Sequence, residues 1–271
     1  MNYMQAPADP VPPHPETAKV RRMRALLGTF VVIEATAPCV EAAHSAIRAA
    51  FATIAELQTL LHPGTARGDL TRIREASPGT PVRVAASTWD LLRLASELSA
   101  LSEGVFDPSL PHRPGKLRDL ELLAEHRILA HVPVALDFGG FAKGHAVDRS
   151  IQVLVSHGCR SGLVNAGGDM RAFGADPWPV ALRGSDGNFK TFELADAALA
   201  VSDSSSQEAP SEHQGYYNRA WPQDGLICTR AAVVAREAVL ADALTKCLML
   251  CRQAVAARVL QAFEAFALPL T

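Results

Sequence analysis

Hydrophobic residues follow two patterns along the chain, and each pattern predicts one type of element. Between residues 40 and 61 the apolar positions recur every three or four residues, which predicts a helix with one buried face. The same spacing predicts a second helix over residues 87–101, which ends before Gly104. The β-branched and apolar run over residues 29–35 predicts a buried strand instead.

The centre of the chain predicts a strand, a glycine turn, a helix and a second strand in succession. We expect the strands over residues 134–138 and 161–165, and the helix over residues 141–157. Gly158 follows the helix, where a glycine commonly ends one. This order is typical of a βαβ-like unit, in which a helix joins two strands of one sheet.

The remaining segments complete an α/β chain. We expect strands over 180–183 and 189–194, a surface loop over 202–215, a last strand over 227–235, and helices over 237–251 and 253–266. No internal repeat is visible, so the expected fold class is α/β, with a mixed sheet flanked by helices. The proline-rich residues 1–20 predict an extended leader, and residues 21–271 a single domain.

Composition and charge exclude several classes of function. With 271 residues, 48% of them hydrophobic, the chain can bury a large core, and its net charge of -2 gives no basic surface for nucleic acid. The five cysteines form no Cys-x-x-Cys pair, which argues against a disulfide framework and a zinc site. The sequence shows no secretory signal and no lipid-acceptor cysteine. It also has no stretch of ~18 apolar residues that could span a membrane. We therefore expect a cytoplasmic protein without membrane insertion.

Two glycine-rich segments carry the strongest candidate chemistry. The first, DFGGFAKG at residues 137–144, leads into a predicted helix, where backbone N–H groups and the positive helix end favour an anion. The second, NAGGD at residues 165–169, follows the next predicted strand. We expect the two loops to meet at the strand ends and to form a phosphate-binding cleft. Each loop could also be a structural turn without a ligand.

These segments resemble the paired signature of the FAD:protein FMN transferase (ApbE-like) family. That signature runs Asp-x-Gly-Gly-x-Ala-Lys-Gly-x-x-x-Asp and then Val-Asn-Ala-Gly-Gly-Asp, and DFGGFAKGHAVDR and LVNAGGDM fit it in order and spacing. The segments Gly28-Thr29, Gly104-Val105-Phe106-Asp107-Pro108 and Ala241-Asp242-Ala243-Leu244 resemble three further motifs of the family. The likeness extends from residue 27 to residue 246 and implies an ApbE-like fold, with a mixed, largely antiparallel sheet flanked by helices.

The resemblance implies a phosphoryl transfer in which the pyrophosphate of FAD is broken, FMN passes to a threonine of an acceptor protein, and AMP is released. The implied partners are thus FAD and a threonine-bearing protein. The candidate catalytic residues are Lys143, Asp169 and Lys246. The candidate residues for binding the flavin nucleotide are Gly28, Thr29, Phe106, Asp107, Gly139, Gly140, Lys143, Asn165, Ala166, Gly167, Gly168, Asp169 and Ser204.

The resemblance also implies a magnesium ion, and here the sequence departs from the family. The family holds Mg²⁺ through the backbone oxygen matching Ala142, the carboxylate matching Asp242 and a threonine four residues after it. In this chain Lys246 stands at that position and the threonine is Thr245, so Ala142, Asp242 and Thr245 are the candidate ligands. One hypothesis is that the Lys246 ammonium pairs with Asp242 and replaces the cation. The alternative is an exposed helical Asp–Lys pair of little consequence.

Other departures leave two functions open. The family's Thr-Ser-Gly segment appears as Ser202-Asp203-Ser204-Ser205, and its His-x-x-Asp-Pro-x-Thr-Gly signature is absent from residues 217–225. The first function is FMN transfer. The second is that of a flavin-binding relative without transfer activity, such as a flavin sensor, a carrier or a weak FAD pyrophosphatase. A purely structural domain is disfavoured, because it would not need the polar residues of the two loops.

Two side chains have alternative interpretations. Asp169 ends the second glycine loop, so it is either a catalytic carboxylate or a residue that stabilises the turn. His145 follows Lys143 by two residues and could face the cleft, but a surface position on the helix is the favoured interpretation.

Overall fold

The computed structural model describes residues 17–184, 187–204, 218, 220 and 225–270. Its main element is a seven-stranded sheet in the order β1-β2-β6-β7-β10-β11-β12, and all of its neighbouring strands pair antiparallel. The strands are β1 (Ala18–Leu26), β2 (Thr29–Ala37), β6 (Ser161–Ala166), β7 (Asp169–Phe173), β10 (Ala198–Asp203), β11 (Arg230–Ala235) and β12 (Phe266–Ala267). The expected α/β class with a largely antiparallel sheet is confirmed.

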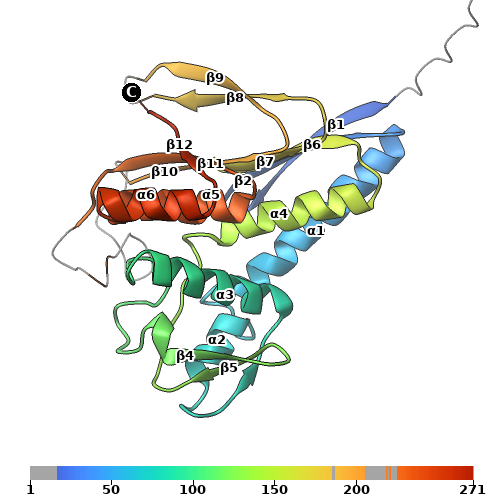
Figure 1. The fold of residues 1–271 in the computed structure, drawn as a ribbon. Coiled ribbons are helices and arrows are strands. Elements are labelled where there is room, and N and C mark those ends of the chain that lie inside the picture. Colours follow the sequence, from blue (N-terminus) through green and yellow to red (C-terminus); the bar gives the residue numbers. More distant parts are fainter. Residues whose placement is uncertain (1–16, 185–186, 205–217, 219, 221–224, 271) are drawn as a thin grey trace, which may run out of the picture.

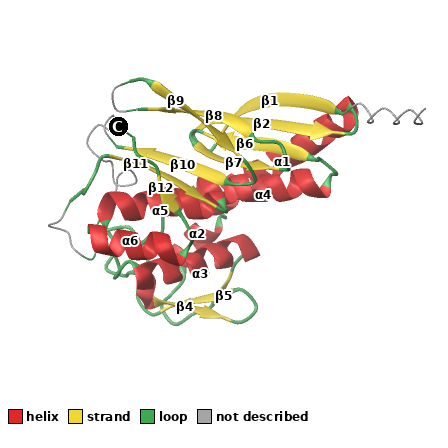
Figure 2. Ribbon diagram, turned by 45° about the horizontal axis from the view of Figure 1, so that its top comes forward, coloured by secondary structure: helices red, strands yellow, loops and turns green. Residues whose placement is uncertain are grey.

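Helices cover one face of this sheet (Figure 2). They are α1 (Val40–Leu61), α4 (Ala142–Ser156), α5 (Ala238–Leu250) and α6 (Gln253–Ala262). The core between the two layers includes Ile47, Phe51 and Ile54 from α1 and Val31 and Ile33 from β2, all almost fully buried. Hydrophobic burial therefore holds the helix layer on the sheet, as the amphipathic pattern of α1 predicts.

A hairpin covers the opposite face of the sheet (Figure 1). Its strands, β8 (Trp178–Arg183) and β9 (Phe189–Leu194), pair with each other and form a separate two-stranded sheet. Trp178, Val180 and Leu182 alternate inward along β8, as expected for a strand with one buried face, and pack with Met170 and Leu199 of the main sheet. The central strands are therefore buried on both faces.

A smaller lobe lies below the helix layer in Figure 1. It contains α2 (Asp69–Glu75), α3 (Ala86–Leu101), a short 3₁₀ helix (Leu117–Asp119) and a three-stranded sheet of β3 (Val82–Arg83), β5 (Arg127–Ala130) and β4 (Leu120–Leu123). The buried carboxylate of Asp69 accepts hydrogen bonds from the Thr88 hydroxyl (2.7 Å) and the Ala85 N–H (2.8 Å), so it ties α2 to the start of α3.

The expected strand over residues 134–138 and the βαβ-like unit built on it are wrong. This segment is buried and extended, but it makes only an isolated bridge between Leu136 and Ser109. The Leu110 N–H donates to Ala135 O and the Asp137 N–H to Pro108 O, so the segment pairs with an irregular loop rather than with a strand. Prolines lack the N–H that a regular ladder would need, and Pro108 and Pro111 bracket this partner loop.

Two other expectations concern segments that the structure describes only in part. The predicted leader lies outside them up to residue 16, and β1 already begins at Ala18. Ser202 and Asp203, assigned to a surface loop, instead end β10, whereas residues 205–215 of that loop are not among the described ones. Within the described part of the chain, no helix has both the length and the apolar character needed to cross a membrane.

Candidate functional site

The two glycine loops occupy different structural settings. Gly139 and Gly140 precede the first turn of α4, and Gly167 and Gly168 form the tight turn between β6 and β7. Both glycines of that turn have positive φ, +67° and +107°. The Asn165 side chain accepts a hydrogen bond from the Gly168 N–H (2.9 Å) and fixes the turn. The first loop therefore precedes a helix, and the second loop is a β-turn. Neither arrangement is that of two parallel strands that end side by side.

Thr29 packs directly against the second loop. The register of β2 and β6 pairs Val31 with Ala166, which brings the first residue of β2 beside the turn. A Cβ on Gly167 would lie 2.5 Å from the Thr29 Oγ1, so a glycine is required both by this contact and by the backbone angle. Gly28, also at positive φ, forms the preceding turn. The predicted Gly28-Thr29 segment thus supports the glycine turn.

Two ion pairs lie beside the loops, a partly buried one between α4 and the second loop and a buried one within α5. Lys143, in the first turn of α4, binds the carboxylate of Asp169 at the end of the second loop. Lys246 of α5 binds the Asp242 carboxylate one helical turn before it, and the Gly144 N–H donates to the other oxygen of that carboxylate (3.0 Å). Asp169 and Asp242 are both 0% exposed. The structure therefore brings together the glycine loops, Lys143, Asp169, Asp242 and Lys246, as expected from the sequence.

Asp169 is the most perturbed carboxylate of this group. Burial and, after it, the charge of Asp242 raise its pKa from 3.8 to about 6, although Lys143 and Lys246 both act in the opposite direction. Its Oδ1 atom is buried and has no hydrogen-bond partner among the described residues. A carboxylate with a free oxygen and a pKa near neutrality can accept a proton from a reacting hydroxyl, so the geometry suits a general base.

Two of the three candidate metal ligands, Asp242 and Thr245, do not fit a divalent cation. Both oxygens of Asp242 are engaged, one by the Lys246 ammonium and one by the Gly144 N–H. The Thr245 hydroxyl is 0% exposed, lies 2.6 Å from Ser202 Oγ and donates to the Asp242 backbone oxygen (2.7 Å). Among the described residues, no cluster of three or more His, Cys, Asp or Glu side chains could hold a metal. A dication at Asp242 would lie against the Lys246 ammonium, and like charges repel strongly at a buried site.

Asp148 is a site residue whose role the sequence analysis missed. Its carboxylate accepts hydrogen bonds from the backbone N–H groups of Ala238 (3.0 Å) and Val239 (2.8 Å) at the start of α5, and from Arg171 (2.6 Å). A carboxylate at a helix N-terminus satisfies free N–H groups and complements the helix dipole. Asp148 therefore fixes α5, and with it Asp242, relative to α4. In the sequence, the feature that could have indicated this role is the position of Asp148 one helical turn after Gly144.

The other predicted binding residues shape the surrounding loops. Phe106 packs edge-to-face on Phe141, with ring centroids 5.4 Å apart, beside the first glycine loop. The Asp107 carboxylate accepts hydrogen bonds from the Ser109 N–H (2.8 Å) and the Leu117 N–H (3.3 Å). Ser204 follows β10, and its N–H and hydroxyl both donate to the Thr229 carbonyl rather than to the glycine loops.

His145 does not lie at the surface, contrary to expectation. It is 9% exposed, because the α4 face that bears it packs inside the molecule. Burial, helped by the charge of Arg149, lowers its pKa from 6.5 to about 4. Its Nε2 atom has no hydrogen-bond partner within the described part of the chain. His145 is therefore a neutral core residue at physiological pH.

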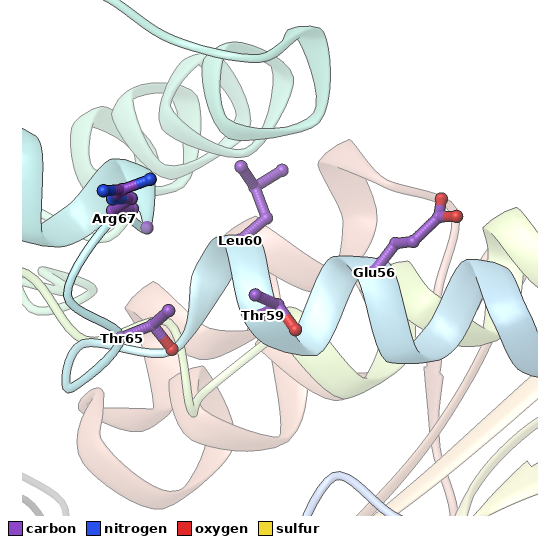
Figure 3. A pocket seen from close by; sticks show the side chains of 6 residues that line it. Glu56, Thr59, Leu60, Thr65 and Arg67 are labelled. Carbon is purple, nitrogen blue, oxygen red and sulfur yellow. The ribbon is translucent and has the colours of Figure 1, made fainter.

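A surface hollow at the end of α1 is separate from this site (Figure 3). Its volume is about 320 Å³. The lining residues are Glu56, Thr59, Leu60, Thr65, Arg67 and Gly68. None of the predicted site residues lines it, so the hollow carries no part of the candidate chemistry.

Comparisons with known proteins relate the chain to FAD:protein FMN transferases. A model of the ApbE family matches residues 27–268. FAD:protein FMN transferases from Treponema pallidum and Rhodobacter capsulatus are 24% and 28% identical; the matches cover 77% and 44% of this chain, but 68% and 28% of those proteins.

Solved structures extend the likeness to the fold. The flavinyl transferase ApbE of Pseudomonas stutzeri superimposes with a TM-score of 0.78 at 21% identity, over 93% of this chain and 90% of that one. The flavin transferase ApbE of Vibrio cholerae gives a TM-score of 0.79 at 18% identity, over 93% of both chains. Since the family model spans nearly the whole sequence, the chain belongs to the ApbE family.

Proposed function

We propose that this protein is an FAD:protein FMN transferase, which moves FMN from FAD to a threonine of an acceptor protein and releases AMP. The observation that carries the proposal is the convergence of both glycine loops on the Lys143–Asp169 and Lys246–Asp242 pairs. Backbone N–H groups and ammonium groups together form a positive site for a diphosphate. The curated relatives with this activity support the assignment.

The proposed reaction is a single phosphoryl transfer. The threonine oxygen forms a bond to the phosphorus of the FMN half, and the bond from that phosphorus to the bridging oxygen of the pyrophosphate breaks. AMP leaves with that electron pair, and the hydroxyl proton passes to a base, for which we propose Asp169. Lys143 and Lys246 stabilise the negative charge that develops on the phosphate oxygens, which is the main requirement of such a reaction.

A second candidate is a flavin-binding relative that does not transfer FMN. It is favoured by the absence of the family's His-x-x-Asp-Pro-x-Thr-Gly signature, whose region, residues 217–225, lies mostly outside the described residues. In a weak FAD pyrophosphatase, water would replace the threonine as the nucleophile, and FMN and AMP would both be released.

Incubation with FAD and a threonine-bearing peptide, followed by mass spectrometry and nucleotide chromatography, distinguishes these functions. Covalent FMN on the peptide with AMP in equal amount supports the transferase. AMP with free FMN supports the pyrophosphatase, and intact bound FAD supports a carrier or sensor. Lys143→Met should lose whichever reaction is found, whereas Lys19→Met, at a surface ion pair with Glu34, should retain it. A protein that binds no FAD would contradict both candidates.

A further inference from the structure

Lys246 differs from an ordinary surface lysine on a helix. It is 7% exposed, and its partner Asp242 is 0% exposed, so the alternative of an exposed helical Asp–Lys pair is wrong. A buried ammonium loses most of its hydration and is retained only where a carboxylate compensates it. Lys246 is therefore held at a fixed place in the interior by its bond to Asp242.

That place lies at the meeting point of the two glycine loops. A Cβ on Gly140 would lie 3.8 Å from Lys246 Cγ, so the lysine stem passes beside the first loop. The charges of Lys246 and Asp242 both act on the buried Asp169 carboxylate, which ends the second loop. The ammonium thus occupies the region where a diphosphate bound by both loops would require positive charge.

Among the residues that the structure describes, the two ion pairs of the site balance in charge. Two carboxylates, Asp169 and Asp242, face two ammonium groups, Lys143 and Lys246. A divalent cation could bind Asp242 only by displacing Lys246, which would leave a buried ammonium without a partner. Since breaking one half of a buried ion pair is strongly unfavourable, the chain disfavours the metal at this position.

We propose that the Lys246 ammonium takes the place of the divalent cation, so that this protein binds the diphosphate of FAD without a metal ion. This inference rests on the proposed function for the identity of the ligand. Lysine supplies a single positive charge, fewer than a divalent cation. It is covalently part of α5, however, whereas a metal ion must bind from solution. Lys143 provides the second positive charge, and the diphosphate binds between the two.

Metal binding to the free protein tests the inference without any nucleotide. Mn²⁺ is titrated into the wild type and into Lys246→Thr, and bound Mn²⁺ is followed by electron paramagnetic resonance. The variant removes the ammonium and places a hydroxyl one turn after Asp242, which suits a hard cation. We expect no stoichiometric Mn²⁺ in the wild type and about one Mn²⁺ in the variant, lost again in Lys246→Thr/Asp242→Asn. Stoichiometric Mn²⁺ in the wild type that requires Asp242 would overturn the inference.

FAD binding is the second measurement that tests the inference. Quenching of flavin fluorescence should give the wild type the same affinity in EDTA and in excess Mg²⁺. Lys246→Met, which keeps the stem but not the charge, should bind FAD about tenfold to one-hundredfold more weakly, the usual effect of losing a hydrogen bond to a charged group. Lys246→Thr should bind FAD well only with Mg²⁺. Lys19→Met serves as the matched control, because Lys19 lies at the opposite end of the β1–β2 hairpin from Gly28.

The outcomes separate the two proposals. Wild-type FAD binding that vanishes in EDTA and returns with Mg²⁺ would overturn the metal-free site while supporting the proposed function. No FAD binding in either condition would contradict the proposed function, and the Mn²⁺ titration would still decide whether Lys246 replaces the cation. Circular dichroism identifies a variant that fails to fold. In that case the Mn²⁺ titration and the FAD binding of the wild type alone decide whether the site is metal-free.

Discussion

Gly144 of α4 lies directly against Val239 of α5: a Cβ on Gly144 would stand 2.7 Å from the Val239 Cα and closer still to the preceding carbonyl. Cβ atoms do not approach backbone so closely, so the glycine is what allows the two helices to touch. The Gly144 N–H also donates to the Asp242 carboxylate. This contact therefore sets the distance between the first glycine loop and the Asp242–Lys246 pair.

We expect Gly144→Ala to destabilise the protein by about 1–3 kcal/mol, because the added methyl group must push α4 and α5 apart. FAD binding should weaken as well, since the displacement separates the groups of the site. Urea unfolding and FAD titration measure the two effects. Gln152→Ala, at an exposed position of the same helix, is the control and should change neither by much. An unchanged FAD affinity in Gly144→Ala would show that the contact does not position the site.

Asp148→Asn should destabilise the protein by about 2–4 kcal/mol. The substitution removes the negative charge that binds Arg171 and faces the N-terminus of α5, and the breaking of a partly buried pair is the larger of the two effects. Urea unfolding gives the magnitude. The matched control is Asp176→Asn in an exposed turn, where we expect little change. Equal effects at the two positions would contradict this role of Asp148.

Gly167→Ala tests the turn between β6 and β7. Its methyl group would lie 2.5 Å from Thr29 Oγ1, and alanine disfavours a φ of +67°. Gly187→Ala is a matched control, because Gly187 also has positive φ but no atom within 4 Å of the added Cβ. Both variants should lose about 1 kcal/mol from backbone strain. We expect Gly167→Ala to lose more stability and, in contrast to Gly187→Ala, to bind FAD more weakly.

Helices α1 and α3 could be predicted closely because each buries one amphipathic face. The structure ends α1 and α3 within about a residue of the expected bounds, as tertiary packing and local spacing agree there. The segment over 134–138 was wrong because a buried apolar run does not reveal whether its partner is a strand or a loop. The end of β10 was assigned to a loop because the polar Ser202-Asp203 resembles the segment that follows it.

The candidate site, too, could be predicted only in part from the sequence. Its loops and its charged residues could be predicted, because each is visible in a short stretch of sequence. The Asp148–Ala238 bond could not, since it joins residues 90 positions apart. The burial of His145 and Lys246 was equally hidden, because it depends on which face of a helix meets which neighbour, and this is a property of the assembled fold.

His145 should make the stability depend on pH. Because burial lowers its pKa from 6.5 to about 4, the unfolded chain takes up a proton at a higher pH than the folded protein. The stability present above pH 6.5 is therefore lost as the pH falls toward 4, by up to about 3 kcal/mol. Asp169 acts in the opposite direction: its pKa is raised to about 6, so its contribution grows as the pH falls from 6 to 3.8.

The comparison of His145→Gln with the wild type isolates the histidine. Urea unfolding of both proteins at about pH 7 and about pH 5 should show that acidification costs the wild type more stability than the variant. His157→Gln, on the exposed end of the same helix, controls for the loss of a histidine as such. The same stability difference between wild type and His145→Gln at both pH values would contradict the expected effect of burial.

The connectivity of the site also bears on how the protein is made. Gly140, Gly167 and Asp242 come from distant parts of the sequence and meet only when α5 packs beside α4. A nascent chain on the ribosome therefore lacks the proposed diphosphate site until residue 246 has emerged from the exit tunnel. Lys143 and Asp169 can pair earlier, but they then have neither Asp242 nor Lys246 beside them. Flavin binding at the proposed site would require synthesis of this segment, so flavin uptake would report that the C-terminal helices have docked.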